Sequence, residues 1–372
     1  MGTRRILGNL VALVVAGVVS VTVGELVLRA FVTLPLRRTA PEVRYLPHPE
    51  RRFTLMPGQA AYSYGAPVTV DDRGFRRNDA GDQARGEGPV VLALGDSFTF
   101  GLGVRDTETW PARLETRLRE RAGQAVSVIN AGTISYGVSQ ELDLLRASVS
   151  RLKPAIVVHG LYWNDFMTTG TAAEAPSVLT PDGYFVWDRM DDNRGVVRRL
   201  ASWTSSRSAF LFSLRRLVSR ATTADGTSAY GRAYDEMLER GLAPEEWRPI
   251  EEFYRAVLAL GREHGFSTFV VILPVNSIVN RPRSSEHPFA VAARRYLDAL
   301  GISYVDGFRL WEERGSGDRD LFLPQGPDAH LNPEGYRLVA DAVADGLLQT
   351  ASTADALRTP GSGVSSTSGD ER

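Results

Sequence analysis

Hydrophobic residues occur along the middle and C-terminal parts of the chain as five short continuous runs separated by amphipathic stretches. The runs occupy residues 89–95, 125–132, 155–162, 267–275 and 302–307. The stretches between them repeat apolar residues at helical spacing and stop at a glycine or a proline. Strands that alternate with helices and contain few polar residues are typical of a parallel sheet covered on both faces. The pattern therefore predicts an α/β domain with a parallel sheet of about five strands.

A longer apolar run lies near the N-terminus. Residues 6–24 carry no charge and follow Arg4 and Arg5, and about 19 residues are enough for a helix to cross roughly 30 Å of hydrocarbon. No face of such a helix is polar, which disfavours a core helix. No clean small-residue cleavage site follows, which favours an uncleaved anchor over a cleaved signal peptide. We therefore predict a single-pass membrane anchor within residues 1–38.

The side of the membrane on which the rest of the chain lies is predicted less directly. Arginines flank both ends of the apolar run, so the positive-inside count does not decide the orientation. The N-terminal tail is very short, and for that reason we expect the bulk of the chain outside the cytoplasm.

The remaining segments are assigned from composition. Residues 39–88 are rich in proline, arginine and glycine, which indicates a linker or N-terminal extension with one hairpin. The domain itself is predicted over residues 89–350. Within it, residues 166–250 interrupt the alternation of strands and helices, and they form either a lid over the strand ends or two ordinary packing helices. Residues 351–372 are small and polar, as in disordered tails.

Composition excludes several classes of function. The 43 basic and 44 acidic residues nearly cancel, so we expect no nucleic-acid partner. The absence of cysteine excludes disulfides, thiolate catalysis and cysteine-bound zinc. The sequence also lacks an H-E-x-x-H motif and the glycine-rich phosphate-binding motifs. We therefore expect neither a metal ion nor a cofactor.

Side chains suited to catalysis follow the predicted strands. Gly95-Asp96-Ser97 ends the first strand, Asn130-Ala131-Gly132 ends the second, and Trp163-Asn164-Asp165 follows the third. Asp328 and His330 stand shortly before the last helix. Because the carboxyl ends of parallel strands meet at one edge of a sheet, we expect these groups to converge there.

The residue types indicate acyl transfer through a serine. Histidine is the usual base for a serine nucleophile, and a carboxylate behind it fixes its tautomer. Asp328 is two residues before His330, a spacing that puts both side chains on one side of an extended segment. The Ser97 and Gly132 backbone N–H groups and the Asn164 amide are candidate donors to an oxyanion.

These residues resemble the SGNH hydrolases, also called the GDSL family. Four blocks occur in the family's order over roughly residues 89–350: GDSFTFG, NAGTISYG, LYWNDF and DAHLNPEGY. The resemblance implies a flavodoxin-like three-layer α/β/α sandwich and ester hydrolysis, with Ser97 as nucleophile and His330 as base. It also implies an oxyanion hole of Ser97, Gly132 and Asn164. The family's commonest pattern places the acid three residues before the histidine, and the two-residue spacing here is similar to a branch associated with bacterial surface polysaccharide acetylation.

Structural roles are the alternatives for single residues. Ser97 alone could cap the helix that follows it, and Asp96 is expected to satisfy backbone donors in the turn. Gly132 alone would be an ordinary turn glycine. The other histidines lack an acid spaced as suitably as Asp328; they are expected in loops, at a helix end or, for the one in the third strand, in the core: His48, His287, His264 and His159.

Three functions remain open at this point. The first is a membrane-anchored serine esterase that removes short acyl groups, chiefly acetyl, from an envelope or exported glycan. The second is an O-acyltransferase that uses the same serine. The third is a non-catalytic glycan-binding or scaffold protein, because fold alone does not establish activity. The oligomeric state is not predicted.

Overall fold

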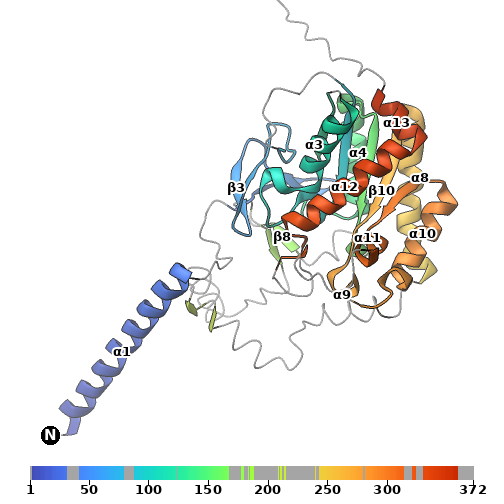
Figure 1. Ribbon diagram of the computed structural model, residues 1–372. Coiled ribbons are helices and arrows are strands. Elements are labelled where there is room, and N and C mark those ends of the chain that lie inside the picture. Colours follow the sequence, from blue (N-terminus) through green and yellow to red (C-terminus); the bar gives the residue numbers. More distant parts are fainter. Residues whose placement is uncertain are drawn as a thin grey trace, which may run out of the picture.

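A computed structural model describes most of the predicted domain and the segment before it (Figure 1). The described residues are 2–31, 42–78, 88–123, 125–166, 177–179, 183, 185–187, 208, 210–211, 213–214, 239, 243–279, 281–313, 321–323 and 330–358.

Five parallel strands form the central sheet in the order β11-β10-β7-β5-β6. All five predicted strands are present. The first strand lies one position in from an edge, the second forms that edge, and the other three extend the sheet to the opposite edge. This order is the flavodoxin-like order that the sequence predicts. The strands are β5 (Val90–Gly95), β6 (Ser127–Asn130), β7 (Ile156–Leu161), β10 (Ser267–Ile272) and β11 (Ser303–Asp306).

Helices cover both faces of the sheet and make it three-layered (Figure 1). On one face α3 packs beside α12, and Arg117 of α3 pairs with Asp341 of α12 at 2.6 Å. On the other face, side chains of α4 and α8 both hydrogen-bond to His159 of β7. Trp247 of α8 stacks on Tyr296 of α10. The helices are α3 (Trp110–Ala122), α4 (Val138–Leu152), α8 (Pro244–His264), α10 (Pro288–Leu300) and α12 (Pro333–Gln349), with the short helices α2 (Ser97–Phe100), α9 (Asn276–Val279) and α11 (Gly307–Glu313).

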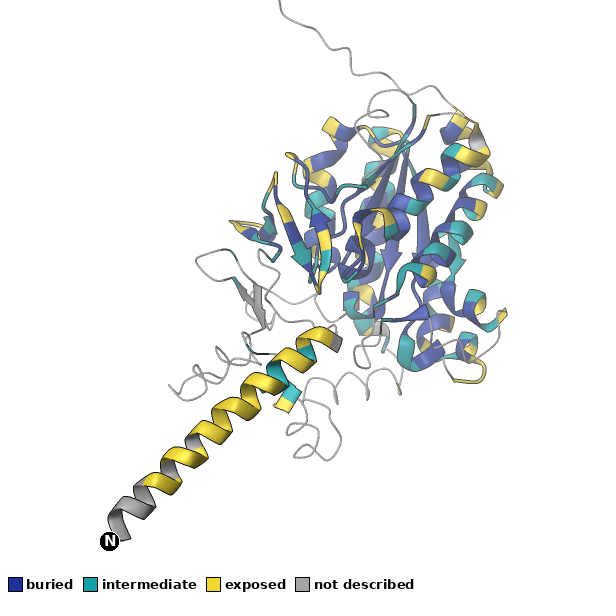
Figure 2. Cartoon of the chain, turned by 60° about the vertical axis from the view of Figure 1, so that its left-hand side comes forward, coloured by how far each residue is buried: buried dark blue, intermediate teal, exposed yellow. Residues whose placement is uncertain are grey.

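The two middle strands explain why the predicted runs contain few polar residues. Every residue of β7 is buried, and β5 is buried from its second residue onward. Helices lie on both sides of these strands, so neither face needs polar side chains (Figure 2). The carboxyl ends of β5, β6 and β7 therefore meet at one edge, where the candidate side chains stand.

The N-terminal extension contains two hairpins, whereas the sequence predicts one. They pair β1 (Tyr45–His48) with β2 (Arg52–Leu55), and β3 (Ala60–Ser63) with β4 (Ala66–Thr69). Phe53 and other apolar residues of the hairpins form a second core with Phe100 and Tyr136 of the α/β domain. The Tyr136 hydroxyl also donates to the Phe53 carbonyl at 2.6 Å. Residues 42–78 are thus part of the folded domain.

The first part of the predicted C-terminal tail is helical. Residues 351–358 form helix α13 (Ala351–Arg358), and they bury Ala354 and Leu357. Two apolar side chains at this spacing lie on one face of a helix, and they stabilise it by packing on the domain rather than by their own propensity. The tail prediction for residues 359–372 falls outside the described residues.

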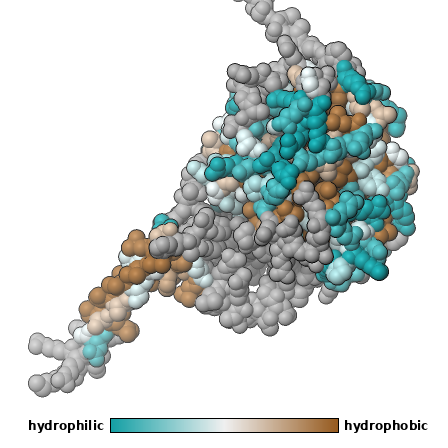
Figure 3. Space-filling model, viewed as in Figure 1, coloured by the Kyte–Doolittle hydropathy of each residue, from teal (hydrophilic) through white to brown (hydrophobic). Residues whose placement is uncertain are grey.

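Helix α1 (Gly2–Phe31) extends away from the α/β domain, and most of the apolar side chains described on it are exposed (Figures 1 and 2). Residues Val11–Ala30 have a mean hydropathy of 2.4, and none of this stretch is buried. Figure 3 shows hydrophobic residues along much of α1, whereas the visible face of the domain has many hydrophilic residues with hydrophobic areas between them. The helix is long and apolar enough to cross a membrane.

Most of the predicted insertion, residues 166–250, lies outside the described residues, so the choice between a lid and packing helices stays a prediction. Its described part includes a hairpin of β8 (Ser177–Leu179) and β9 (Phe185–Trp187). The carbonyl of Gly183, between these strands, accepts a hydrogen bond of 2.8 Å from the Tyr45 N–H. The insertion therefore contacts the N-terminal extension.

Candidate active site

Ser97 is the first residue of α2, immediately beyond the central strand β5. Asp96 caps this helix, since its carboxylate accepts the Phe98 N–H at 2.8 Å. The prediction that Asp96 satisfies backbone donors is confirmed. Because Asp96 caps α2, the Ser97 hydroxyl is not needed as a cap and can serve another partner. Ser97 is 8% exposed.

That partner is His330. The Ser97 Oγ lies 2.8 Å from the His330 Nε2, although the two residues are 233 apart in sequence. The His330 carbonyl accepts the Leu323 N–H at 2.7 Å, and Asn332, two residues further along, caps α12. The histidine is thus held between a short backbone pairing and a helix start. A hydroxyl and an imidazole at this distance have the geometry of a nucleophile and its base.

Phe98 orients the imidazole, a role that sequence reasoning missed. Its ring stacks on His330 with centroids 4.2 Å apart, and on Tyr162 with centroids 3.7 Å apart. Phe98 is buried, so the stack limits the rotation of the histidine ring. The signal in the sequence was an aromatic residue next to the serine, but its partner could not be known before the fold.

The candidate oxyanion donors lie at the ends of three neighbouring strands. No hydrogen-bond partner of the Ser97 N–H lies within the described part of the chain. The Gly132 N–H donates to Asn130 Oδ1 at 3.0 Å, so this donor would have to be shared between Asn130 and an oxyanion. Asn164 is half-buried on the turn after β7, and its side chain lies near enough to the Asp96 carboxylate to lower the pKa of that group. Asp328, the predicted acid, lies outside the described residues.

Gly132 is required by space. A Cβ at this position would lie 2.1 Å from the Phe100 N and 2.5 Å from the Thr99 carbonyl carbon. Both atoms belong to the backbone of α2, which cannot move aside as a side chain could. The absence of a side chain therefore lets the end of β6 approach the serine helix.

Three buried carboxyl groups lie in the domain core, one of them on the residue before Ser97. Asp96, Asp165 and Glu141 are all fully buried. Burial raises the pKa of Asp96 to about 7, and the charge of Glu141 adds to this, while hydrogen bonds from Phe98 and Asn164 oppose it. Burial also raises the pKa of Asp165, with Glu141 and Asp96 contributing. Burial and nearby like charge thus favour the protonated forms of Asp96 and Asp165 more than in an exposed aspartate.

We expect replacement of Asp96 by asparagine to change how stability depends on pH. The raised pKa means that folded Asp96 keeps its proton to about pH 7, whereas the unfolded chain loses it near pH 4. Wild-type stability from this group therefore falls as the pH rises through that window. Asp96→Asn has no carboxyl group to titrate and should not lose this stability. The Tm of the variant minus the Tm of the wild type should therefore increase by roughly several degrees between pH 5 and pH 8.

Thermal unfolding of both proteins across this pH range tests the expectation. Asp355→Asn is the matched control, because the Asp355 side chain is 75% exposed. A Tm difference for Asp96→Asn that is the same at pH 5 and pH 8 would contradict the prediction.

His159 lies apart from the serine. It is fully buried in β7, with its Nε2 2.8 Å from Glu141 Oε2 and its Nδ1 2.8 Å from the Tyr254 hydroxyl. These contacts fit the expectation that His159 belongs to the core. Among the described residues, no group of three or more metal-binding side chains is found.

Comparison with known proteins identifies the family. The model of the GDSL-like lipase/acylhydrolase family matches residues 93–338. Similar solved structures include TesA, which is 17% identical with a TM-score of 0.41, covering 70% of this chain and 98% of TesA. The acetyl xylan esterase AlAXEase is 17% identical with a TM-score of 0.39, covering 69% and 98% of the two chains.

A third similar structure is larger than the matched region. The two-domain esterase CEX, described as active on acetylated mannans, is 13% identical with a TM-score of 0.42, covering 76% of this chain and 55% of CEX. No curated protein matches the chain.

Proposed function

This chain belongs to the GDSL-like lipase/acylhydrolase family and is an ester-bond hydrolase, and from this premise we propose that it is a membrane-anchored serine esterase. It removes short acyl groups, chiefly acetyl, from an envelope or exported glycan. The observation that carries the proposal is the 2.8 Å contact between Ser97 Oγ and His330 Nε2 at the carboxyl end of the sheet.

The contact supports a two-step mechanism. His330 Nε2 takes the proton of Ser97 as Oγ attacks the acyl carbon, and the carbonyl oxygen becomes an oxyanion. The Ser97 N–H, the Gly132 N–H and the Asn164 amide are the proposed donors to this oxygen. The protonated His330 then gives its proton to the departing sugar oxygen. A water molecule then attacks the acyl carbon while His330 takes its proton. The bond to Ser97 Oγ breaks, His330 returns the proton to Oγ, and the acyl group leaves as a carboxylic acid.

The acid that partners His330 is proposed to be Asp328, on the basis of the sequence. Asp328 would accept the second ring N–H and stabilise the imidazolium. The stack on Phe98 already limits the orientation of the ring, so Asp328 would act chiefly on its charge and tautomer.

A small acyl group is favoured by the surroundings of the serine. Ser97 is only 8% exposed, and the stacked rings of Phe98 and Tyr162 stand beside His330. A short acyl group reaches such an oxygen more readily than a long chain. The location is proposed from α1, whose apolar stretch Val11–Ala30 is unburied in the structure and long enough to span a bilayer.

We expect the full-length protein in detergent to release acetate from O-acetylated oligosaccharides without an added acyl donor. Mass spectrometry of the products and enzymatic measurement of acetate check this. The Ser97→Ala variant should release none. Acetyl groups that move to an added oligosaccharide while free acetate stays at background would instead identify an O-acyltransferase. No change in any acetylated substrate, with Ser97 unreactive, would leave a non-catalytic protein.

A further inference from the structure

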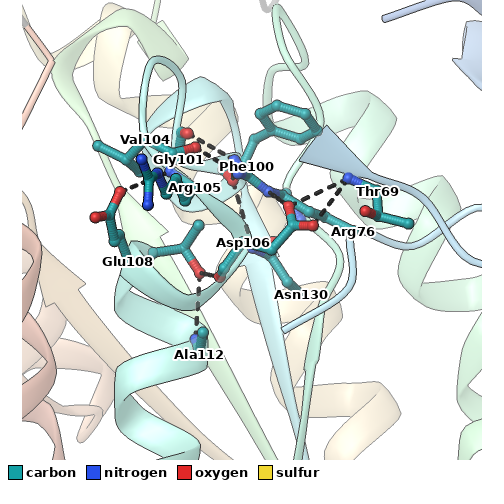
Figure 4. A network of polar contacts seen from close by, with 12 residues as sticks. Thr69, Arg76, Phe100, Gly101, Val104, Arg105, Asp106, Glu108, Ala112 and Asn130 are labelled. Atoms are coloured by element: carbon teal, nitrogen blue, oxygen red, sulfur yellow. Dashed lines mark hydrogen bonds and ion pairs between the residues drawn. The ribbon is translucent and has the colours of Figure 1, made fainter. Parts of the chain in front are cut away.

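Arg76, in the segment before the family domain, inserts its guanidinium into the α/β domain. The side chain is fully buried. It donates four hydrogen bonds, three of them to backbone carbonyls (Figure 4). The acceptors are the carbonyls of Phe100, Gly101 and Val104, each at 2.6 Å, and Asp106 Oδ1 at 3.1 Å.

These acceptors belong to one loop, residues 95–106, which we call the serine loop because Ser97 lies in it. The Ser97 carbonyl accepts the N–H groups of Gly101 and Leu102 at 3.0 and 3.1 Å. The Ser97 carbonyl is therefore bound by N–H groups of this turn, and Arg76 binds carbonyls of the same turn. A shift of the loop where the guanidinium binds would move the backbone of Ser97.

The same arginine reaches the Gly132 strand end through its backbone. The Arg76 N–H donates to the Asn130 carbonyl at 3.2 Å. The Asn130 side chain in turn donates to the Phe100 carbonyl at 3.4 Å and accepts the Gly132 N–H. The serine loop and the Gly132 turn are thus joined through Arg76 and Asn130. These are the two backbone segments that would supply N–H donors to an oxyanion.

The charge of Arg76 is balanced within this arrangement. Asp106 pairs with its Nε, and the Asp106 carboxylate also accepts the Thr69 N–H of the N-terminal extension at 3.0 Å. The guanidinium carbon lies 4.7 Å from the centre of the Phe100 ring. Five donors in a rigid plane suit several carbonyls at once, which a lysine could not satisfy.

From these contacts we infer that Arg76 is a positioning residue of the esterase, and that residues 42–78 are an obligatory part of the catalytic unit. The inference rests on the proposed role of Ser97 as nucleophile. The family match begins only at residue 93, so this contribution comes from outside the matched region. Arg76 acts by fixing the serine loop relative to Gly132, and it does not contact the substrate.

The test uses the full-length chain in detergent with Arg76→Met, Arg76→Lys and a matched control. Arg294→Met is the control, because Arg294 is also largely buried, pairs with Asp306 at 2.6 Å and donates to the Ser285 carbonyl. It does so beside β11, at the far edge of the sheet from β6. Measured are the Tm, the rate of labelling by a fluorophosphonate, and kcat and KM for a p-nitrophenyl ester.

We expect both methionine variants to lower the Tm, but only Arg76→Met to slow the chemistry. The labelling rate and kcat should fall about 100-fold with little change in KM, because displacements of about 1 Å in a reacting group cost this much. Arg76→Lys, which keeps the charge but not the fork, should lose a smaller part of the rate. If Arg76→Met does not fold, the lysine variant carries the comparison.

Two outcomes separate the inference from the proposed function. Labelling of an Arg76 variant at the wild-type rate, with wild-type Ser97 reactive, would overturn the positioning role and leave the esterase proposal standing. Equal losses of kcat in the Arg76 and Arg294 variants would also overturn it, because they would show a general effect of stability. An unreactive Ser97 in the wild-type protein would instead remove the proposed function on which the inference rests.

Discussion

Replacing Ser97 with alanine should abolish both ester turnover and covalent labelling by a fluorophosphonate. The change removes the only proposed nucleophile, and loss of a serine nucleophile lowers kcat by roughly 10⁴-fold or more. Ser97 lies at the start of α2 without acting as its cap, because Asp96 has that role. The fold should therefore tolerate the substitution, with a Tm close to that of the wild type. Hydrolysis of a p-nitrophenyl acetate-type ester and peptide mapping of the labelled protein measure the two activities.

The control for this variant is Ser148→Ala. Ser148 is also buried, but it lies on α4 and away from the serine loop. It should keep full turnover and labelling. Wild-type turnover by Ser97→Ala, or a label mapped to another residue, would remove Ser97 from the mechanism.

Replacing His330 with alanine should cost nearly as much as replacing the serine. Without the imidazole at 2.8 Å, no base takes the Ser97 proton, and the hydroxyl is a weak nucleophile at neutral pH. When nucleophile and base act as a unit, removing either costs about as much as removing both. We therefore expect kcat to fall by roughly 10⁴-fold, and the double variant to be no slower than either single variant.

The comparison with other histidines makes this prediction specific. His264→Ala is the matched control, since His264 lies in the last turn of α8 and pairs only weakly, at 3.7 Å, with Glu263. It should keep wild-type kinetics. A His330→Ala variant with more than a tenth of the wild-type kcat would exclude His330 as the base. Additive losses in the double variant would show that the two residues act independently.

From the sequence, site residues could be predicted only where the residue type itself indicates a catalytic role. Ser97 was chosen because its hydroxyl follows a predicted strand, and His330 because it stands two residues after an acid in the last of the four family-like blocks. The fold brings the two side chains together. Phe98 and Arg76 were missed because a buried phenylalanine or a single arginine is ordinary in any sequence. Their roles depend on partners at distant positions, which only the folded chain identifies.

The order of the N-terminal extension also could not be predicted from the sequence alone. Its proline, arginine and glycine content predicted a linker, yet its two hairpins form a core with Phe100 and Tyr136. Four-residue strands with mixed polar and apolar positions carry little periodic signal. They are stabilised by contacts with the domain rather than by their own propensity, so composition underestimates their order.

The sequence by itself determined the family, the five strands of the central sheet and the apolar character of the N-terminal helix. These features depend on local pattern. A strand buried on both faces and a helix suited to hydrocarbon each consist of consecutive apolar residues. The tertiary structure alone decided the contact of Ser97 with His330 across 233 residues, the packing of the N-terminal hairpins on the domain, and the binding of Arg76 to the serine loop. Contacts between distant segments depend on how the whole chain closes its core, and no short stretch of sequence contains that information.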